Sequence, residues 1–477
     1  MKNIKYILGV LAIAFTLQSC ESLLEQENPN SVSEEQGVST LIGTEKIVRS
    51  FYASLPTNLE MYNQALITDE LVYPAATNAN QGGGRGQYSW EFGPGTTTDR
   101  DDIAGLYRGY YYVITNTNIV INNVDLLNPQ TAADKTLQQL YKAEAFGMRA
   151  YSHYMLLRNF SPKYSPAEKG VIYKTTTDQY EKGSRLNMQA SYAKVLEDLN
   201  YAISIFPASV PAAHGGTYKN NRLTKEALYG IKAKIALDMG NYDEALTSSN
   251  LAIGTRALVT TQAELTALWN DSNDYQEVIF KRSNIDGAGS APGGLWYYAT
   301  TGQTQWNASQ TLLTKYTSTD FRRTLFLTAG GAQIPGKYLL PWQQKIKSGA
   351  GIADAKLIRT ADLVLIKAEA YARKNDLANA LIEYTKVRTA RSAGATVAFT
   401  SQQDAFDKIL DERARELVYE GSRLNDLKRF DKTVSRIAAD SRPTYPTLTM
   451  TDKNKLTLPI PQKEIFANPN IEQNTGW

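Results

Sequence analysis

Residues that could carry out catalysis or bind a metal are scarce in this chain. Its 477 residues include two histidines, His153 and His214, and a single cysteine, Cys20. A zinc site normally takes three or four ligands, most of them histidine or cysteine, and this composition does not supply such a set. We therefore interpret each histidine as structural or exposed, and we expect no cofactor.

One segment has the spacing of a phosphate-binding loop without its chemistry. Residues 331–338 read GAQIPGKY, but Tyr338 stands where a serine or threonine would bind magnesium. Pro335 also removes an amide that could hold a phosphate. No G-x-S-x-G sequence of a serine hydrolase occurs, and nothing nominates a pair of carboxylates, although such a pair could still meet in the fold and act on glycosides. We expect no enzymatic activity, with a surface glycosidase as an alternative.

Aromatic residues are abundant, with 29 tyrosines and six tryptophans. Their rings combine an apolar face with a polar group, which suits the recognition of polar ligands. Two segments rich in glycine and threonine, 80–102 and 284–310, carry Trp90, Trp296 and Trp306. Long irregular segments in a compact chain are often functional. We predict that recognition takes place here, unless these rings belong to the local core.

The single cysteine follows an apolar run at the amino terminus. Residues 6–17 carry no charge, and this run is too short to cross a bilayer as a helix but is typical of a signal peptide. The sequence Leu-Gln-Ser-Cys at 17–20 resembles the lipobox of bacterial lipoproteins. The resemblance implies cleavage before Cys20 and attachment of lipid, including a palmitate-like acyl chain, that anchors the protein to a membrane. An ordinary secretory signal with a chance cysteine is the alternative.

The segment after the cysteine is polar and acidic, and we expect residues 20–37 to form a flexible tether. Removal of residues 1–19 takes away Lys2 and Lys5 and lowers the formal charge from +3 to +1. A nearly neutral chain does not support a nucleic-acid partner, which needs a basic face.

Helical periodicity dominates the rest of the first half. Apolar residues recur at helical spacing in 136–160 and 191–206. Residues 223–253 read as a helix, a Gly-Asn turn and a second helix. These patterns predict a mainly α fold.

The segment 223–253 resembles a tetratricopeptide repeat, because Ala233 and Ala245 lie at the positions where two helices approach closely. Residues 366–388 fit the same frame. Ordinary helical hairpins are the alternative. We predict a tetratricopeptide-like scaffold of helix pairs with large irregular loop insertions, the longest of them at 254–358.

The most charged stretch is DERARELVYEGSRLNDLKRF at 411–430. Its apolar residues form one stripe if the stretch is a single helix. The charged residues then form three pairs at i,i+3 spacing: Arg413–Glu416, Glu420–Arg423 and Arg423–Asp426. We interpret this stretch as a salt-bridged helix docked on the scaffold rather than as a catalytic element.

Several stretches together resemble the SusD/RagB family of nutrient-binding lipoproteins. Besides the lipobox, they are residues 106–125, 142–160, 221–245, 358–391, 412–430 and 458–477. SPKYSP at 161–166 and Thr475 depart from the family pattern and touch loops. The resemblance implies a SusD-like fold. We expect the following regions: a signal peptide at 1–19, a tether at 20–37, an N-terminal helical region at 38–253 and a C-terminal region at 254–477, the last with an irregular insertion at 254–358, helices at 359–430 and a tail at 431–477.

The resemblance also implies a function. Members of this family are non-catalytic binders in the outer membrane that face the cell exterior. They cap a TonB-dependent transporter of the SusC type and capture oligosaccharides, or in some branches peptides. We expect this chain to capture oligosaccharides in the same way. A peptide-binding member of the family is the alternative, and a periplasm-facing scaffold for protein contacts is a further one.

The family has no binding motif that transfers residue by residue, so the candidate site rests on chemistry. Sugars have C–H faces that stack on aromatic rings, and hydroxyls that pair with polar side chains. Two groups provide both: Arg85 with Trp90, and Trp296 with Tyr297, Tyr298 and Trp306. Trp342 is the next candidate.

Overall fold

A computed structural model gives the fold of the chain. The structure describes residues 37–74, 84–95, 103–210, 220–272, 276–284, 297–298, 303–329, 332–337, 352–394 and 398–477. Cys20, Trp296 and Trp342 lie outside the described residues, as do the signal peptide, most of the tether and His214.

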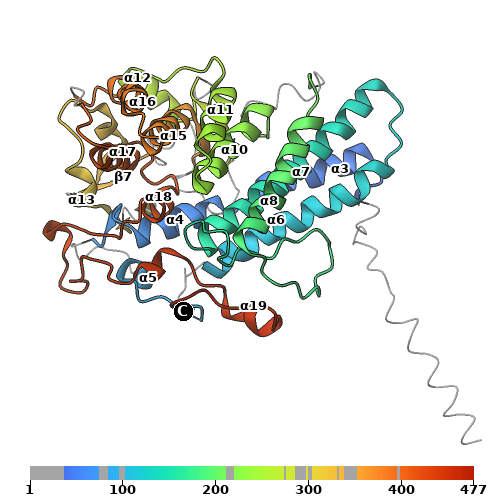
Figure 1. Ribbon diagram of the computed structural model, residues 1–477, viewed down its shortest axis with the longest axis horizontal. Helices are drawn as coiled ribbons and strands as arrows, with labels where there is room; N and C mark the ends of the chain where they lie inside the picture. The colour runs from blue at the N-terminus through green and yellow to red at the C-terminus, as the bar shows by residue number, and fades with distance from the viewer. Residues whose placement is uncertain are drawn as a thin grey trace, which may run out of the picture.

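The N-terminal region is helical, as the periodicity predicted. Its main helices are α3 (Leu41–Ala53), α4 (Thr57–Ile67), α6 (Ile103–Asn123), α7 (Ala132–Phe160) and α8 (Met188–Ile205), with the short α5 (Arg85–Ser89) between α4 and α6. The longest, α7, begins with a capping box in which Thr131 and Asp134 satisfy each other's backbone amides. Helix α7 packs between α6 and α8 (Figure 1).

Helix pairs continue the stack, as expected for a tetratricopeptide-like scaffold. The first pair is α10 (Lys225–Met239) and α11 (Tyr242–Ile253), and the second is α15 (Thr360–Arg373) and α16 (Leu377–Ala390). The first pair turns at Gly240, whose φ of 78° favours glycine. Ala233 and Ala245 are fully buried, and α11 packs on α15, so the two pairs form one continuous layer.

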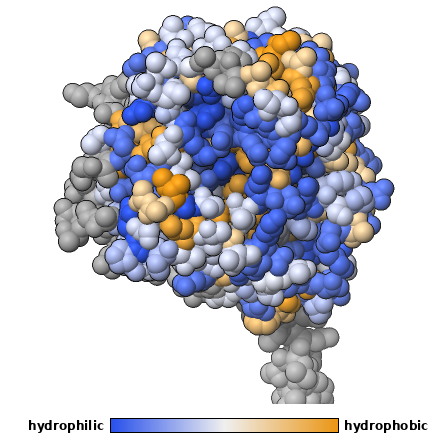
Figure 2. All heavy atoms as spheres, turned by 60° about the vertical axis from the view of Figure 1, so that its left-hand side comes forward, coloured by the Kyte–Doolittle hydropathy of each residue, from blue (hydrophilic) through white to orange (hydrophobic). Residues whose placement is uncertain are grey.

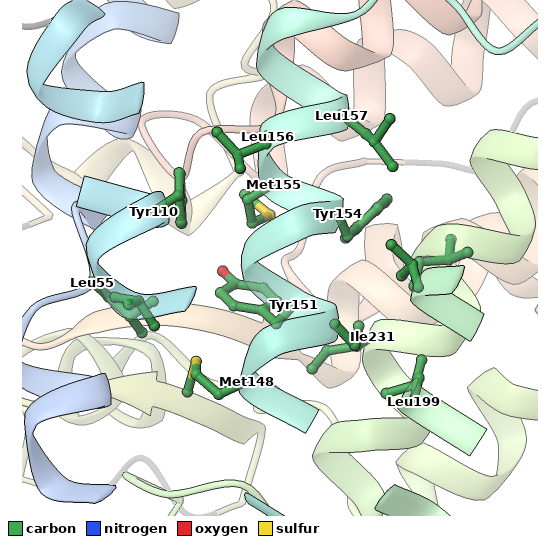
Figure 3. Packing of buried hydrophobic residues seen from close by; sticks show 14 of the residues in the cluster. Leu55, Tyr110, Met148, Tyr151, Tyr154, Met155, Leu156, Leu157, Leu199 and Ile231 are labelled. Atoms are coloured by element: carbon green, nitrogen blue, oxygen red, sulfur yellow. The ribbon is translucent and has the colours of Figure 1, made fainter. Parts of the chain in front are cut away.

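The core lies on both sides of α7. Figure 3 shows Tyr151 and Met155 directed toward Tyr110 and Leu55, while Tyr154 and Leu157 extend toward the opposite side. Most of the side chains of α7 from Leu140 onward are buried. Burial on two faces explains why the apolar pattern of this helix is broad rather than a single stripe.

The segment between the helix pairs contains a short helix α12 (Gln262–Trp269), a one-turn helix α13 (Gln310–Leu313) and short strands. The strands that the structure describes form four antiparallel two-stranded ladders: β1 (Leu71–Val72) with β5 (Asn307–Ala308), β2 (Val278–Arg282) with β8 (Ala355–Arg359), β3 (Tyr297–Tyr298) with β4 (Gln303–Thr304), and β6 (Phe326–Ala329) with β7 (Ala332–Pro335). The ladder of β1 and β5 fixes this segment against the N-terminal region.

The charged stretch at 411–430 is not one helix, so that prediction was wrong. Helix α17 (Gln402–Glu416) ends before the turn, and α18 (Arg423–Arg429) begins after it. Gly421 and Tyr419 in this turn have φ values of 70° and 60°, which an α-helix cannot contain. A final short helix, α19 (Gln462–Ala467), lies in the C-terminal tail.

None of the three predicted i,i+3 pairs is among the ion pairs of the described residues, so those predictions were wrong as well. Two other pairs in this stretch have this spacing, Arg415 with Glu412 and Arg429 with Asp426, and further partners lie farther away in the chain. Arg413 bonds Asp426 at 2.9 Å and Asp362 at 3.2 Å, and Arg423 bonds Asp69 at 2.7 Å. Helices α17 and α18 are therefore docked on the scaffold, as expected, and buried ion pairs to Asp362 and Asp69 in distant segments hold them there in addition to the pairs within the stretch.

Glu416 is the centre of a buried ionic network. Its carboxylate accepts hydrogen bonds from Arg322, Arg359 and Arg391 at 2.9–3.1 Å. Burial alone would raise the pKa of Glu416, but these three guanidinium groups hold it well below its usual range. The network joins α17 to the segments that carry β8, α16 and the chain before β6.

The GAQIPGKY segment and His153, both considered above as possible sites of chemistry, have structural roles. Lys337, the lysine of the loop-like GAQIPGKY segment, bonds Glu420 at 2.7 Å and lies 4.3 Å from the centroid of the Trp269 ring. His153 is fully buried and stacks on Tyr173. Burial lowers the pKa of His153 to about 3, so this imidazole stays neutral.

Figure 2 shows a largely hydrophilic face on which hydrophobic residues gather in small separate areas. None of the helices that the structure describes combines the length and the hydropathy needed to cross a membrane.

Candidate ligand-binding site

Four aromatic rings from separate parts of the chain meet at one place, here called the tyrosine cluster: Tyr73, Tyr88, Trp306 and Tyr445. Tyr73 lies 5.0 Å from Tyr445 and 5.7 Å from Trp306, measured between ring centroids. Tyr88 lies 5.2 Å from Trp306 and 5.6 Å from Tyr445. These separations and the tilted or edge-to-face angles are those of favourable aromatic contacts.

Local structure explains how the four rings meet. Tyr73 directly follows β1 and Trp306 directly precedes β5, so the ladder between these strands brings both rings together. Tyr88 lies on α5. Tyr445 belongs to the C-terminal tail and is held there by Arg442, whose Nε donates to the carbonyl oxygen of Tyr73 at 2.9 Å.

Helix α5 needs a glycine at its start. Gly84 has a φ of 89°, and a Cβ at this position would collide with the Leu66 side chain. The close approach places Arg85 beside the cluster, with its guanidinium carbon 5.7 Å from the centroid of the Tyr73 ring. Arg85 is half-buried, and its Nε has no hydrogen-bond partner within the part of the chain that the structure describes.

The cluster has a buried base and an accessible rim. Tyr88 and Trp306 are each only 1% exposed, whereas Tyr73, Tyr445 and Arg85 are half-buried. The indole nitrogen of Trp306 donates to the hydroxyl of Tyr62 at 3.2 Å. The rim side chains are therefore the groups that a ligand could reach, and the base fixes their orientation.

Arg436 lies beneath the base and fixes it further. Its guanidinium carbon is 3.9 Å from the Tyr88 ring centroid and 4.6 Å from that of Trp90. The guanidinium also donates to the carbonyl oxygens of Leu66, Thr68 and Tyr88. Burial lowers the pKa of Arg436 and raises the pKa of Tyr88, which leaves a cation over a neutral ring at neutral pH.

The structure corrects the expectation that Trp90 and Trp306 expose their rings. Trp90 is 9% exposed, its indole nitrogen donates to Ile67 O at 2.8 Å, and Arg436 covers one face. Trp306 is buried under Tyr73 and Tyr88. Both rings therefore belong to the local core. Their burial is favourable because each indole N–H donates to a buried acceptor.

The remaining predicted residues are placed in part. Arg85 lies at the rim of the cluster. The backbones of Tyr297 and Tyr298 form β3, which pairs with β4 just before Trp306, but their side chains lie outside the described residues, as does all of Trp296. Sequence reasoning missed Tyr73 and Tyr445. The only signals were the abundance of tyrosine and the placement of Tyr445 between two prolines, in a segment without periodicity.

The side chains of the rim are suited to binding a ligand. It presents two phenol rings, their hydroxyls and one guanidinium, which together stack on apolar faces and bond polar groups. Among the residues that the structure describes, no group of three or more histidine, cysteine, aspartate or glutamate side chains could hold a metal.

Comparisons with known proteins identify the scaffold. The fold defines a tetratricopeptide-like helical protein with irregular insertions. A model of the SusD family matches residues 261–477, and a model described as "Starch-binding associating with outer membrane" matches residues 23–237. The chain belongs to the SusD family, which confirms the resemblance.

Individual relatives are distant but match along nearly the whole chain. A SusD-like protein P25 of Formosa agariphila is 24% identical over 98% of this chain and 97% of its own. Among solved structures, a putative sugar binding protein from Bacteroides vulgatus has a TM-score of 0.75 at 20% identity, covering 92% of this chain and 99% of that one. A SusD superfamily protein from Bacteroides thetaiotaomicron has a TM-score of 0.74 at 21% identity, covering 91% and 99%. These likenesses confirm the fold.

Proposed function

We propose that this protein captures oligosaccharides at the outer membrane and delivers them to a SusC-like TonB-dependent transporter. The observation that carries the proposal is the tyrosine cluster, with an accessible rim on a fixed aromatic base. Sugar rings offer C–H faces to Tyr73 and Tyr445, and their hydroxyls bond the phenol oxygens and Arg85. The family membership and the sugar-binding name of one structural neighbour support the same ligand class.

Three predicted residues extend the proposed site. The ladder of β3 and β4 ends at Thr304, two residues before Trp306. The chain therefore emerges from this ladder beside the base of the cluster. We propose that Trp296, Tyr297 and Tyr298 contribute further rings to the platform that Tyr73 and Tyr445 begin.

The proposed protein is a binder without catalytic activity. The described rim consists of Tyr73, Tyr445 and Arg85 and supplies no pair of carboxylates of the kind that glycosidases use. The lipid on Cys20 anchors the mature chain in the outer membrane, and the cluster faces the exterior, where nutrients arrive. A lipid anchor of two or three acyl chains holds a protein stably at a membrane.

Calorimetry of the protein against a panel of neutral oligosaccharides and a panel of short peptides tests the ligand class. We expect heat of binding from at least one oligosaccharide and none from the peptides. Binding of peptides alone would place the protein among peptide-capturing members of the family. Appearance of shortened sugars in the same mixtures would favour a glycosidase and contradict the proposal.

A further inference from the structure

A pocket lies between the loop after α7 and the C-terminal tail, and it shares no residue with the tyrosine cluster. It has a volume of about 410 Å³, within the range of roughly 300–1,000 Å³ that is typical of small-molecule sites. We call it the tail pocket. Its lining residues are Pro162, Lys163, Tyr164, Ser165, Glu168, Lys169, Asn454, Thr457, Gln473, Asn474 and Thr475.

The tail side of this pocket is fixed by hydrogen bonds between side-chain amides and the backbone. The side-chain Nδ2 of Asn474 donates to Phe160 O at 2.9 Å and to Leu458 O at 2.8 Å. The side chain of Gln473 bonds both the carbonyl and the amide of Ile460 at 2.8 Å. These contacts tie the tail to the end of α7, so the pocket is formed before any ligand enters.

The same contacts leave an acceptor unused. Because both donors of the Asn474 amide are engaged, the orientation of the amide is settled and its Oδ1 is an acceptor. Asn474 and Thr457 are only 7% and 6% exposed, and neither the Asn474 Oδ1 nor the Thr457 hydroxyl has a hydrogen-bond partner among the described residues. Neither atom belongs to the fully buried polar atoms that lack a partner, so both keep contact with solvent and a ligand in the pocket could bond them.

The mouth of the pocket adds both hydrogen-bond donors and hydrogen-bond acceptors. Ser165 and Thr475 bring exposed hydroxyls, and Asn454 brings an exposed amide. Hydroxyls and amides both donate and accept. A ligand that is rich in hydroxyl groups matches this mixture, because each hydroxyl can donate a hydrogen bond and also accept one.

The charges of the pocket balance. Lys169 pairs with Glu472 at 3.0 Å, and Lys163 and Glu168 contribute one charge of each sign. A site for phosphate or another anion needs an excess of positive charge, which is lacking here. The balance favours a neutral ligand.

One ring lines the pocket. Tyr164 is half-buried and stands edge-to-face on Tyr192, with 5.1 Å between ring centroids. This contact holds the Tyr164 ring in place, so that it can offer an apolar surface to the C–H face of a sugar.

We infer that the tail pocket is a second binding site for a neutral sugar unit. The inference rests on the proposed function, because it takes the same class of ligand. Two contacts connect the two sites. Phe92, which follows α5, packs on Trp477 with 4.9 Å between ring centroids. The indole nitrogen of Trp477 donates to Thr457 O, in the tail pocket, at 3.0 Å. Figure 1 shows α5 and the carboxyl terminus near one another along the same edge of the molecule.

Hydrogen–deuterium exchange of the full-length protein tests the inference, with neutral gluco-, manno-, xylo- and galacto-oligosaccharides as probes. We expect a bound probe to slow exchange at least twofold in peptides that cover 161–169 and 473–477. The double variant Ser165→Arg/Thr475→Arg fills the pocket from exposed positions and should abolish this protection, while protection around Tyr445 persists. Thr247→Arg, at an exposed position of α11, is the matched control and should change neither.

The outcomes separate the two proposals. Protection around Tyr445 alone, or protection of 161–169 that survives the double variant, would overturn the tail pocket and leave the proposed function standing. Protection of the pocket by inorganic phosphate would contradict a neutral sugar as its ligand. If no oligosaccharide slows exchange at either place, both proposals are wrong.

Discussion

At the scale of single residues, burial decides what an aromatic side chain does. Trp90 lies in a glycine-rich segment, which suggested exposure, yet Arg436 and the carbonyl of Ile67 enclose it. Tyr73 and Tyr445 lie in less conspicuous segments and remain accessible. A glycine-rich context indicates an irregular backbone but does not determine on which side of it a ring lies, because that depends on partners far along the chain.

Replacement of Trp90 by alanine should therefore destabilise the protein. Loss of a buried tryptophan typically costs about 3–5 kcal/mol, and the Ile67 carbonyl also loses its donor. We expect the free energy of unfolding, measured by denaturant titration, to fall by this order. The matched control is Tyr180→Ala, at a residue that is 88% exposed, and it should change stability by less than about 0.5 kcal/mol. Equal stability of the two variants would show that the Trp90 ring is not part of the core.

The carboxyl of Glu70 should make stability depend on pH. Burial raises the pKa of Glu70 to about 8, although the backbone amide of Tyr419 donates to it at 2.9 Å. The folded state then binds a proton that the unfolded state releases near pH 4.5, so this group's contribution to stability falls as pH rises from about 5 to 7. The slope is at most about 1.4 kcal/mol per pH unit.

Denaturant titrations of wild type and Glu70→Gln at pH 5 and pH 7 check this expectation. The variant keeps the neutral, protonated shape and should lose the component of the slope that Glu70 supplies. If both proteins change stability equally over this interval, Glu70 is ionised in the folded state.

At the scale of helices, the sequence pattern was informative where contacts are local and misleading where they are not. The helix pairs at 225–253 and 360–390 follow from periodicity, a glycine turn and small residues. The stretch 411–430 has helical composition throughout, but its turn exists because Glu416 and Arg423 bond partners in distant segments. Such ion pairs leave no periodic signal.

Replacement of Glu416 by alanine should strongly destabilise the fold. Three buried guanidinium groups would lose their common partner, and removal of one member of a buried ionic group typically costs about 3–5 kcal/mol. Glu197→Gln is the control, since Glu197 pairs with Lys194 at 3.6 Å on the surface and such pairs contribute about 0–1 kcal/mol. Thermal unfolding that is equally affected by both changes would contradict the central role of Glu416.

The candidate site shows the same limit as the ion pairs. Arg85 and the segment around Trp306 were found from composition, because aromatic residues in irregular segments favour recognition. Tyr445 was not, because its place beside Tyr73 depends on the tail folding back along the molecule, where Arg442 bonds the Tyr73 carbonyl. No property of residues 431–477 alone reveals that contact.

At the scale of the whole molecule, anchoring and folding should be separable. Cys20 precedes a polar, acidic segment, and the described fold begins at residue 37. We expect Cys20→Ala to leave the melting temperature unchanged and to release the protein from the membrane, because its acyl chains would supply the attachment. Fractionation of cells in high salt measures the effect. A variant that still sediments with the outer membrane, in cells without a SusC-like partner, would contradict the lipid anchor.

The tyrosine cluster links the fold to the proposed function, so the most direct test is the affinity of the double variant Tyr73→Ala/Tyr445→Ala. Both side chains are half-buried at the rim, and each stacked ring contributes about 0.5–1.5 kcal/mol. Calorimetry with the oligosaccharide that wild type binds best should show affinity reduced about tenfold or more, whereas Tyr180→Ala retains it. Unchanged affinity in a folded double variant would place the ligand elsewhere and contradict the proposed function of the cluster.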